Sequence, residues 1–162
     1  SYKRVFLGSG CREHRLRFLG PKMIDGDSLP VTYVYLHGGF KHPNYPDQTY
    51  PSNFRCGGKG CPLCTEARAI GKYEKDNNVP KAEKTAWKKQ AKKYAIYWAI
   101  NRENNEISLV HVPDSSFNKD EETLSQILAN KLIELAEMDL NPFDSKDGMD
   151  IVITSTAVDN KV

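Results

Sequence analysis

The sequence has no long apolar run and no N-terminal apolar segment of the kind found in signal peptides. A membrane-spanning helix needs about 20 consecutive apolar residues, so we expect no membrane association. Charged residues make up 27% and hydrophobic residues 39% of the 162 residues, which is typical of one soluble domain with a buried core. The chain has no initiator Met, and we expect terminal arms to lie outside it.

Cysteines are few, but three of the four fall within nine residues. Cys56, Cys61 and Cys64 lie in the run Arg-Cys-Gly-Gly-Lys-Gly-Cys-Pro-Leu-Cys. A Cys-x-x-Cys pair lets two thiolates bind one tetrahedral ion from a single turn, and the glycines give the backbone freedom to bring in the third. This spacing predicts one structural zinc ion. A redox pair or disulfides are the alternatives.

A structural zinc site needs a fourth protein ligand. The predicted one is His37, which ends the apolar run Val31–Leu36. His42 follows five residues later, and Cys11 and His14 lie upstream, so these three are the alternatives.

The motifs of a catalytic zinc are missing. The zinc deaminases of nucleobases use His-x-Glu with Pro-Cys-x-x-Cys, whereas here Pro62 follows Cys61 and neither His37 nor His42 has Glu two residues on. The sequence also has no His-Glu-x-x-His motif of a metalloprotease. We therefore expect no enzymatic activity at the cysteine cluster.

The net charge of +2 hides an asymmetry along the chain. Residues 1–113 hold 19 Lys and Arg against 10 Asp and Glu, a net of +9, and residues 114–150 hold 3 against 10, a net of −7. A basic body with an acidic segment suits a protein that binds a polyanion on one face.

Hydrophobic periodicity predicts more strands than helices in the first half. Strands are expected over 14–19, 31–37, 94–100, 107–112 and 149–156, of which 94–100 and 107–112 form a hairpin. Helices are expected over 65–75, from Pro80 to Lys93, and after Asn118 with a buried stripe of Leu124, Ile127, Leu128, Leu132 and Leu135. This pattern predicts an α+β fold, mainly β, built as an oligonucleotide/oligosaccharide-binding (OB) barrel.

Aromatic and basic residues alternate with apolar ones on several of these strands. A positive groove that follows phosphates and rings that stack on bases are the two devices that bind single-stranded nucleic acid. Trp98 shares a strand face with Ile96 and is expected in the core, and Tyr97 then faces outward as a stacking residue. The candidates for nucleic-acid contact are Arg15, Arg17, Tyr33, Tyr35, Phe54, Lys88, Lys92, Tyr94 and Tyr97.

Three parts of the sequence carry a resemblance to a known family: the segment 16–22 (Leu-Arg-Phe-Leu-Gly-Pro-Lys), Tyr35-Leu36-His37 and the motif Cys56-x4-Cys61-Pro62-Leu63-Cys64. Together they resemble the single-stranded DNA-binding, helix-destabilising proteins of tailed bacteriophages. The resemblance follows the order of elements along the whole chain. It implies one OB domain over 1–162, with a zinc-binding and helical subdomain inserted at 37–93 and His37, Cys56, Cys61 and Cys64 as ligands. It also implies a DNA cleft that draws on Arg15, Arg17, Tyr33, Tyr35, Tyr94 and Tyr97.

By this resemblance the protein coats and protects unwound single-stranded DNA during phage replication, recombination and repair, in the cytoplasm of the infected bacterium. Replication and recombination proteins would bind through the missing termini. The chain departs from the family pattern in its long His37–Cys56 loop and in lacking a basic N-terminal arm and an acidic C-terminal tail. A zinc-stabilised adaptor for a replication or transcription protein, and an RNA-binding OB protein, are the alternatives.

Overall fold

The structure is a computed structural model of the chain, and it describes residues 2–8, 12–21, 23, 29–38, 41–42, 45–49, 54–115, 121–144 and 146–155. For residues 41–42, 45–49 and 155 it describes the backbone alone. The chain divides into two compact units. We call Ser1–Tyr33 with Tyr94–Val162 the sheet unit, and Val34–Lys93 the cysteine unit.

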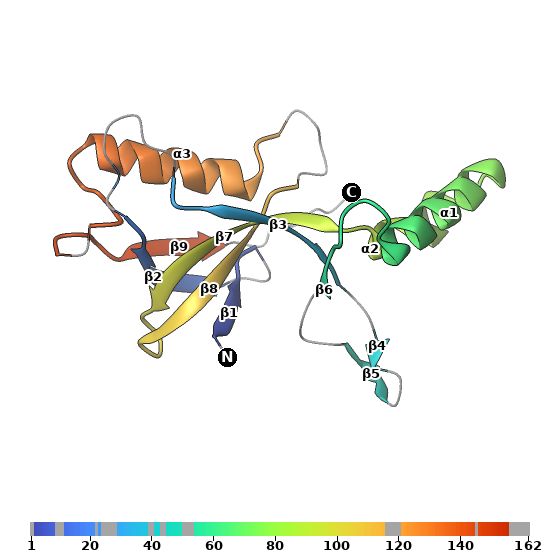
Figure 1. Cartoon of the computed structure of the whole chain (residues 1–162), viewed down its shortest axis with the longest axis horizontal. Helices are drawn as coiled ribbons and strands as arrows, with labels where there is room; N and C mark the ends of the chain where they lie inside the picture. Colours follow the sequence, from blue (N-terminus) through green and yellow to red (C-terminus); the bar gives the residue numbers. More distant parts are fainter. Residues whose placement is uncertain are drawn as a thin grey trace. The chain divides into compact units, whose positions relative to one another are not determined.

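The described elements are strands, three α-helices and one short 3-10 helix (Figure 1). The strands are β1 (Lys3–Phe6), β2 (Arg12–Leu19), β3 (Thr32–His37), β4 (Lys41–His42), β5 (Tyr45–Thr49), β6 (Phe54–Arg55), β7 (Lys92–Asn101), β8 (Glu106–Pro113) and β9 (Ile151–Ser155). The helices are α1 (Pro62–Asp76), η1 (Lys81–Glu83), α2 (Ala86–Lys89) and α3 (Leu124–Glu137).

The main sheet has the strand order β1-β8-β7-β2-β9. β1 runs parallel to β8, whereas β7 is antiparallel to β8 and to β2, and β2 is antiparallel to β9. β3 pairs with β6 and with β7. The expected α+β class and the 94–112 hairpin are therefore confirmed. Over the described residues no pairing joins β1 to β9, so this sheet is open, and the closed OB barrel stays a prediction.

The core of the sheet unit lies on one face of the sheet, beneath α3 (Figure 1). Alternate residues of each strand supply it because side chains along a strand point to opposite faces. Leu128 and Leu132 of α3 are buried and belong to the same core cluster. The strand residues of the core are Val5, Leu16, Phe18, Ala95, Tyr97, Ala99, Val110 and Val112.

The expected orientation of the β7 aromatics was wrong. Tyr97 is fully buried and meets Phe18 edge to face, with ring centroids 5.5 Å apart. Trp98 is 41% exposed on the opposite face. The cross-strand pairs decide this, because Ala99 lies opposite Phe18 on β2 and Trp98 opposite Leu19. Small alanines on either side of Tyr97 leave room for its ring in the core.

Helix α3 begins at Leu124 and is capped by Thr123 rather than by Asn118, which lies outside the described residues. The Thr123 hydroxyl accepts from the Gln126 N–H, and the Gln126 side chain accepts from the Thr123 N–H, which satisfies donors at both positions. Leu128 and Leu132 of the predicted apolar stripe are buried, as expected. Ile127 is half-exposed, and Ser125 is buried instead.

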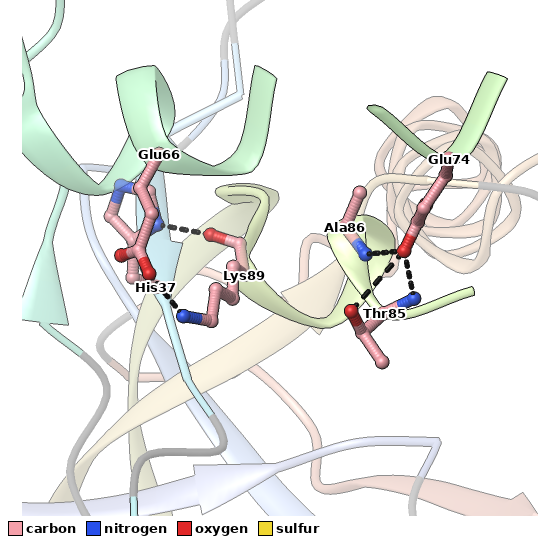
Figure 2. A network of polar contacts seen from close by, with 6 residues as sticks. All are labelled: His37, Glu66, Glu74, Thr85, Ala86 and Lys89. Atoms are coloured by element: carbon pink, nitrogen blue, oxygen red, sulfur yellow. Dashed lines mark hydrogen bonds and ion pairs between the residues drawn. The ribbon is translucent and has the colours of Figure 1, made fainter. Parts of the chain in front are cut away.

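The continuous helix expected from Pro80 to Lys93 is also wrong. The segment forms η1 and α2 separated by extended backbone at Lys84, and β7 has begun by Lys92. The Glu74 carboxylate accepts hydrogen bonds from the backbone N–H groups of Thr85 and Ala86 at 2.5 and 3.1 Å (Figure 2). These hydrogen bonds lie at the start of α2, which is a separate helix from η1. The lysines at 81, 84, 88 and 92 therefore do not form one helical stripe.

Candidate metal centre

The four residues predicted to bind metal lie together in the cysteine unit. One ligand atom from each of His37, Cys56, Cys61 and Cys64 falls within 4.8 Å of the others. His37 Nε2 lies 3.3 Å from Cys61 Sγ and 3.5 Å from Cys64 Sγ, and Cys56 Sγ lies 3.5 Å from Cys64 Sγ. The three described cysteines are free thiols, so no disulfide competes for these sulfur atoms.

Strand pairing and a tight turn bring the cysteines to His37. β6 pairs with the end of β3, and the Cys56 N–H then donates to the Tyr35 carbonyl at 2.7 Å. The chain turns through Gly58 and Gly60, whose φ angles of 76° and 89° suit glycine. Cys61 occupies the N-cap position of α1, and Pro62 opens the helix. This turn places Cys61 and Cys64 one helical turn apart.

The His37 ring is held by the carbonyl of a residue far along the chain. Its Nδ1 lies 2.9 Å from the Lys89 carbonyl oxygen, and the side chain is fully buried (Figure 2). A hydrogen bond donated by Nδ1 leaves Nε2 unprotonated toward the thiols, as metal-binding imidazoles require. The Lys89 ammonium in turn pairs with Glu66 on α1. The helix that carries Cys64 thus also contacts the residue whose carbonyl orients the His37 ring.

The donor set and its spacing fit one tetrahedral ion. Zinc–sulfur bonds of about 2.3 Å place neighbouring sulfur atoms about 3.8 Å apart in a tetrahedral site, close to the separations seen here. Three thiols and one imidazole are a usual zinc donor set. The four residues could therefore hold one metal ion, consistent with a structural zinc.

Backbone donors prepare part of the site for a cation. The N–H of Cys64, with those of Gly57 and Leu63, lowers the pKa of the Cys61 thiol to about 6. The hydrogen bond with the Cys56 side chain and burial raise the pKa of Cys64 to about 11. These backbone N–H groups favour the thiolate form of Cys61, and a bound cation would supply the charge that favours the thiolate form of the other two cysteines.

Among the described residues, no alternative ligand belongs to this group. His14 lies on β2 in the sheet unit, where it is buried opposite Ile153. Cys11 and the side chain of His42 fall outside the described residues.

The predicted nucleic-acid residues differ in exposure. Tyr33, Tyr35 and Phe54 are about half-exposed, and Arg15, Lys88 and Lys92 are exposed. Tyr94 is half-buried. Arg17 is half-buried and donates to the Asp144 carbonyl at 2.7 Å. Tyr97 is buried and cannot stack on a base, so its place among the contact residues was wrong.

A pocket of 510 Å³ lies beside the cysteines, entirely within the cysteine unit. Tyr35 lines it together with Lys59 and Arg68, and Cys56 and Cys64 form part of its wall. Sequence reasoning missed Lys59 and Arg68. The signal was present, because Lys59 lies between the cysteines and Arg68 follows Cys64 by one helical turn.

Trp87 is an exposed aromatic residue that was not among the predicted contact residues. Its ring is 51% exposed, and the ammonium groups of Lys88 and Lys92 lie 5.6 and 5.7 Å from its centroid. This spacing gives cation–π contacts. The two predicted lysines therefore meet at an exposed indole rather than along a helix.

The face of the main sheet opposite the core also gathers aromatic and basic residues. Trp98 meets Tyr2 edge to face at 4.7 Å, and Arg17 lies opposite Ile100 on the same side of the strands. Arg15, two residues before Arg17, shares this side. We call this surface, defined by Tyr2, Arg15, Arg17 and Trp98, the open face. Tyr2 and Trp98 were not predicted to be exposed there.

Comparison of the chain with models of known families, with curated proteins and with solved structures found no match. Across the described residues, no helix is both long enough and apolar enough to cross a membrane.

Proposed function

We propose that this chain is a non-enzymatic single-stranded DNA-binding protein with one structural zinc ion. The observation that carries the proposal is on β3. His37 is buried among the cysteines, whereas Tyr35, two residues earlier, is 53% exposed in the pocket that Lys59 and Arg68 also line. The same strand thus links the candidate metal centre to an exposed ring with cations beside it.

The mechanism combines stacking with phosphate neutralisation. A base stacked on Tyr35 would contribute about 1–3 kcal/mol with little dependence on sequence. Lys59 and Arg68 would neutralise phosphates and release counterions, which makes the affinity fall as salt rises. Unpaired bases offer their faces to such rings, whereas bases in a duplex do not. Preferential binding to the single strand then melts hairpins by mass action.

The open face of the sheet unit supports the same function independently. Trp98 and Tyr2 provide rings, and Arg15 provides an exposed cation. Exposed rings next to a cation are the combination that stacks on bases and neutralises phosphates in single-stranded nucleic-acid binding. Each unit therefore has its own surface for a strand.

We assign the ion a structural role because four protein ligands leave no open position for a reacting water. It would fix the Gly58–Gly60 turn, and with it Lys59, against β3. The proposal has four further parts. They are the OB barrel, the insertion of the cysteine unit into it, a role in phage replication, recombination and repair, and action in the cytoplasm of the infected cell. They rest on the sequence resemblance.

The test is quenching of tyrosine and tryptophan fluorescence during titration with oligo(dT), with a duplex control, at two salt concentrations. We expect tight, salt-sensitive quenching by the single strand and a weak response to duplex. Tyr35→Ala should weaken binding, and Tyr73→Ala, which removes an exposed tyrosine of α1 outside the pocket, is the matched control. Absence of any response would overturn the proposal and favour the adaptor function; a stronger response to oligo(rU) would favour RNA.

A further inference from the structure

The indole of Trp87 lies outside both surfaces that carry the proposed function. It does not line the pocket beside the cysteines, and it is not part of the sheet unit. Its ring is 51% exposed, and its Nε1–H donates to the Lys84 carbonyl at 3.0 Å. This hydrogen bond satisfies the only polar group of the side chain and fixes the direction of the ring. What remains for a partner is therefore the aromatic face.

Two ammonium groups lie beside this ring. The Nζ atoms of Lys88 and Lys92 are 5.6 and 5.7 Å from the ring centroid. Among the described residues neither lysine forms an ion pair, whereas Lys89, between them in sequence, pairs with Glu66. The surrounding segment 81–93 holds six lysines against one glutamate. The exposed ring thus lies in a strongly basic segment with two cations directly at it.

The indole and the pocket beside the cysteines are neighbours along the chain. Gln90 and Ala91 line that pocket, and Trp87 precedes Gln90 by three positions. Three residues span about 11 Å at most, even in a fully extended chain. Stacked nucleotides of one strand advance about 3.4 Å each, so a few of them cover this distance. One strand is therefore long enough to occupy the pocket and to reach the indole.

The chemistry of this surface favours single-stranded nucleic acid over other polyanions. An exposed ring with cations beside it is the combination that stacks on unpaired bases and neutralises their phosphates. An anionic membrane surface also attracts lysines, but segments that bind there insert apolar side chains into the lipid. The segment 81–93 contains no Leu, Ile, Val, Phe or Met. A single indole without aliphatic neighbours in its own segment suits a base better than a lipid.

We propose that Trp87, Lys88 and Lys92 form a second contact for single-stranded DNA in the cysteine unit. A base stacks on the indole, and the two ammonium groups bind neighbouring phosphates. A base that takes a ring face covered by an ammonium group displaces that group, and a phosphate beside the base is the partner to which it moves. The stacked base stabilises the complex more than an exposed cation–π contact stabilises the free protein. This inference rests on the proposed function and extends the binding path beyond the pocket.

Tryptophan fluorescence can report on this contact alone. The chain has two tryptophans, so Trp98→Phe leaves Trp87 as the only one. The full 162-residue variant is titrated with labelled oligo(dT), and tryptophan emission and the anisotropy of the label are followed in parallel. We expect the Trp87 emission to be quenched with the same midpoint as the rise in anisotropy.

The two signals separate this inference from the proposed function. A rise in anisotropy with unchanged Trp87 emission would overturn the contact and leave DNA binding standing. No rise in anisotropy, in the variant or in the wild-type protein, would contradict both. Phosphatidylglycerol vesicles and poly(glutamate) are titrated as the other polyanions. Equal or stronger quenching by either would assign the surface to a membrane or an acidic protein and overturn the inference.

Substitution of the ring tests the stacking. Trp87→Ala should weaken oligo(dT) binding about tenfold, which is within the range for loss of one stacked base. Trp87→Phe keeps an aromatic face and should lose less. Tyr73→Ala removes another exposed ring of the cysteine unit, on α1, and should leave the affinity unchanged. Wild-type affinity in Trp87→Ala would contradict stacking at this position.

Substitution of the lysines tests the phosphate contacts. Lys88→Gln and Lys92→Gln should each reduce the slope of log affinity against log salt by about 0.7, the value for one phosphate of a single strand. Lys131→Gln makes the same charge change on α3, in the sheet unit, and should leave the slope unchanged. A wild-type slope in both Lys88→Gln and Lys92→Gln would overturn their assignment to phosphates.

Discussion

His37 Nδ1 and the Lys89 carbonyl oxygen, 52 residues apart in sequence, lie 2.9 Å from each other. This contact fixes the ring so that Nε2 faces Cys61 and Cys64. Lys89 is the last residue of α2, and the backbone is extended at Gln90 directly after it. The candidate metal centre thus depends on two segments that no local motif connects.

Replacement of His37 should decide the fourth ligand. His37→Ala should weaken zinc binding by more than the roughly 10–100-fold that loss of an orienting partner causes. His37→Cys restores four ligands and should keep one ion per chain. The measurement is zinc stoichiometry and the absorption spectrum of the cobalt-substituted protein. His42→Ala and Cys11→Ser are the controls; loss of metal in either would show that the ligand set is different.

Removal of the metal should loosen the cysteine unit selectively. The three thiols and the imidazole bring β3, β6 and α1 together, whereas the sheet unit has its own core. With chelator, amide hydrogen exchange should rise in α1 and α2 and stay slow in β7 and β8 from Tyr94 to Val112. Equal loss of protection in both units would contradict a local structural role for the ion.

The Glu74 carboxylate should make stability depend on pH. The hydrogen bond from the Thr85 backbone lowers the pKa of Glu74. Burial opposes this shift, and the hydrogen bond from the Ala86 backbone adds to it. A lowered pKa in the folded state stabilises the protein above the ordinary carboxyl pKa, and this stabilisation is lost as pH falls through the folded value. The wild-type protein should therefore have a higher denaturation midpoint than Glu74→Gln near neutral pH. The difference between the two midpoints should become smaller at acidic pH. Glu66→Gln, at an exposed ion pair, should show a smaller difference.

Two residues of α3 should differ in their contribution to stability. Leu132 is fully buried in the core, so Leu132→Ala should lower the free energy of unfolding by about 2–5 kcal/mol. Ile127 is 50% exposed, and Ile127→Ala should cost much less. Urea denaturation followed by circular dichroism measures both. Similar losses in the two variants would contradict the orientation of α3.

Substitution of the neighbouring aromatic residues Trp98 and Tyr97 of β7 should affect DNA binding differently. Trp98→Ala should weaken oligo(dT) binding by about 1–3 kcal/mol, or roughly 5- to 150-fold, if a base stacks on the open face. Tyr97→Phe should leave binding unchanged, because the ring is buried and its hydroxyl has no partner in the described residues. Fluorescence anisotropy of labelled oligo(dT) separates the two.

Local composition was enough to predict several elements. β-branched and aromatic residues predicted the 94–112 hairpin, and its register runs from Tyr94 opposite Pro113 to Asn101 opposite Glu106. The spacing of Cys56, Cys61 and Cys64 predicted a shared ligand group because a short glycine-containing turn leaves their sulfur atoms few ways to be far apart. His37 could be proposed as the fourth ligand because it ends an apolar strand.

Other features depended on partners that are distant in sequence. Alternation along β7 shows that Tyr97 and Trp98 face opposite sides, but only pairing with Phe18 and Leu19 of β2 decides which one is buried. The helix expected over 80–93 is interrupted because a carboxylate on α1 captures the backbone of Thr85 and Ala86. Local propensity contains no information about that donor–acceptor match.

The sequence by itself therefore determined the α+β class, the hairpin and the grouping of the three cysteines, since each depends mainly on residues close together in the sequence. The tertiary structure decided which aromatic rings are exposed, where the segment after α1 bends, and that Tyr35, Lys59 and Arg68 line one pocket. The physical reason is that burial and long-range hydrogen bonds are properties of packed surfaces. A strand or helix acquires its inner face only when another element covers it.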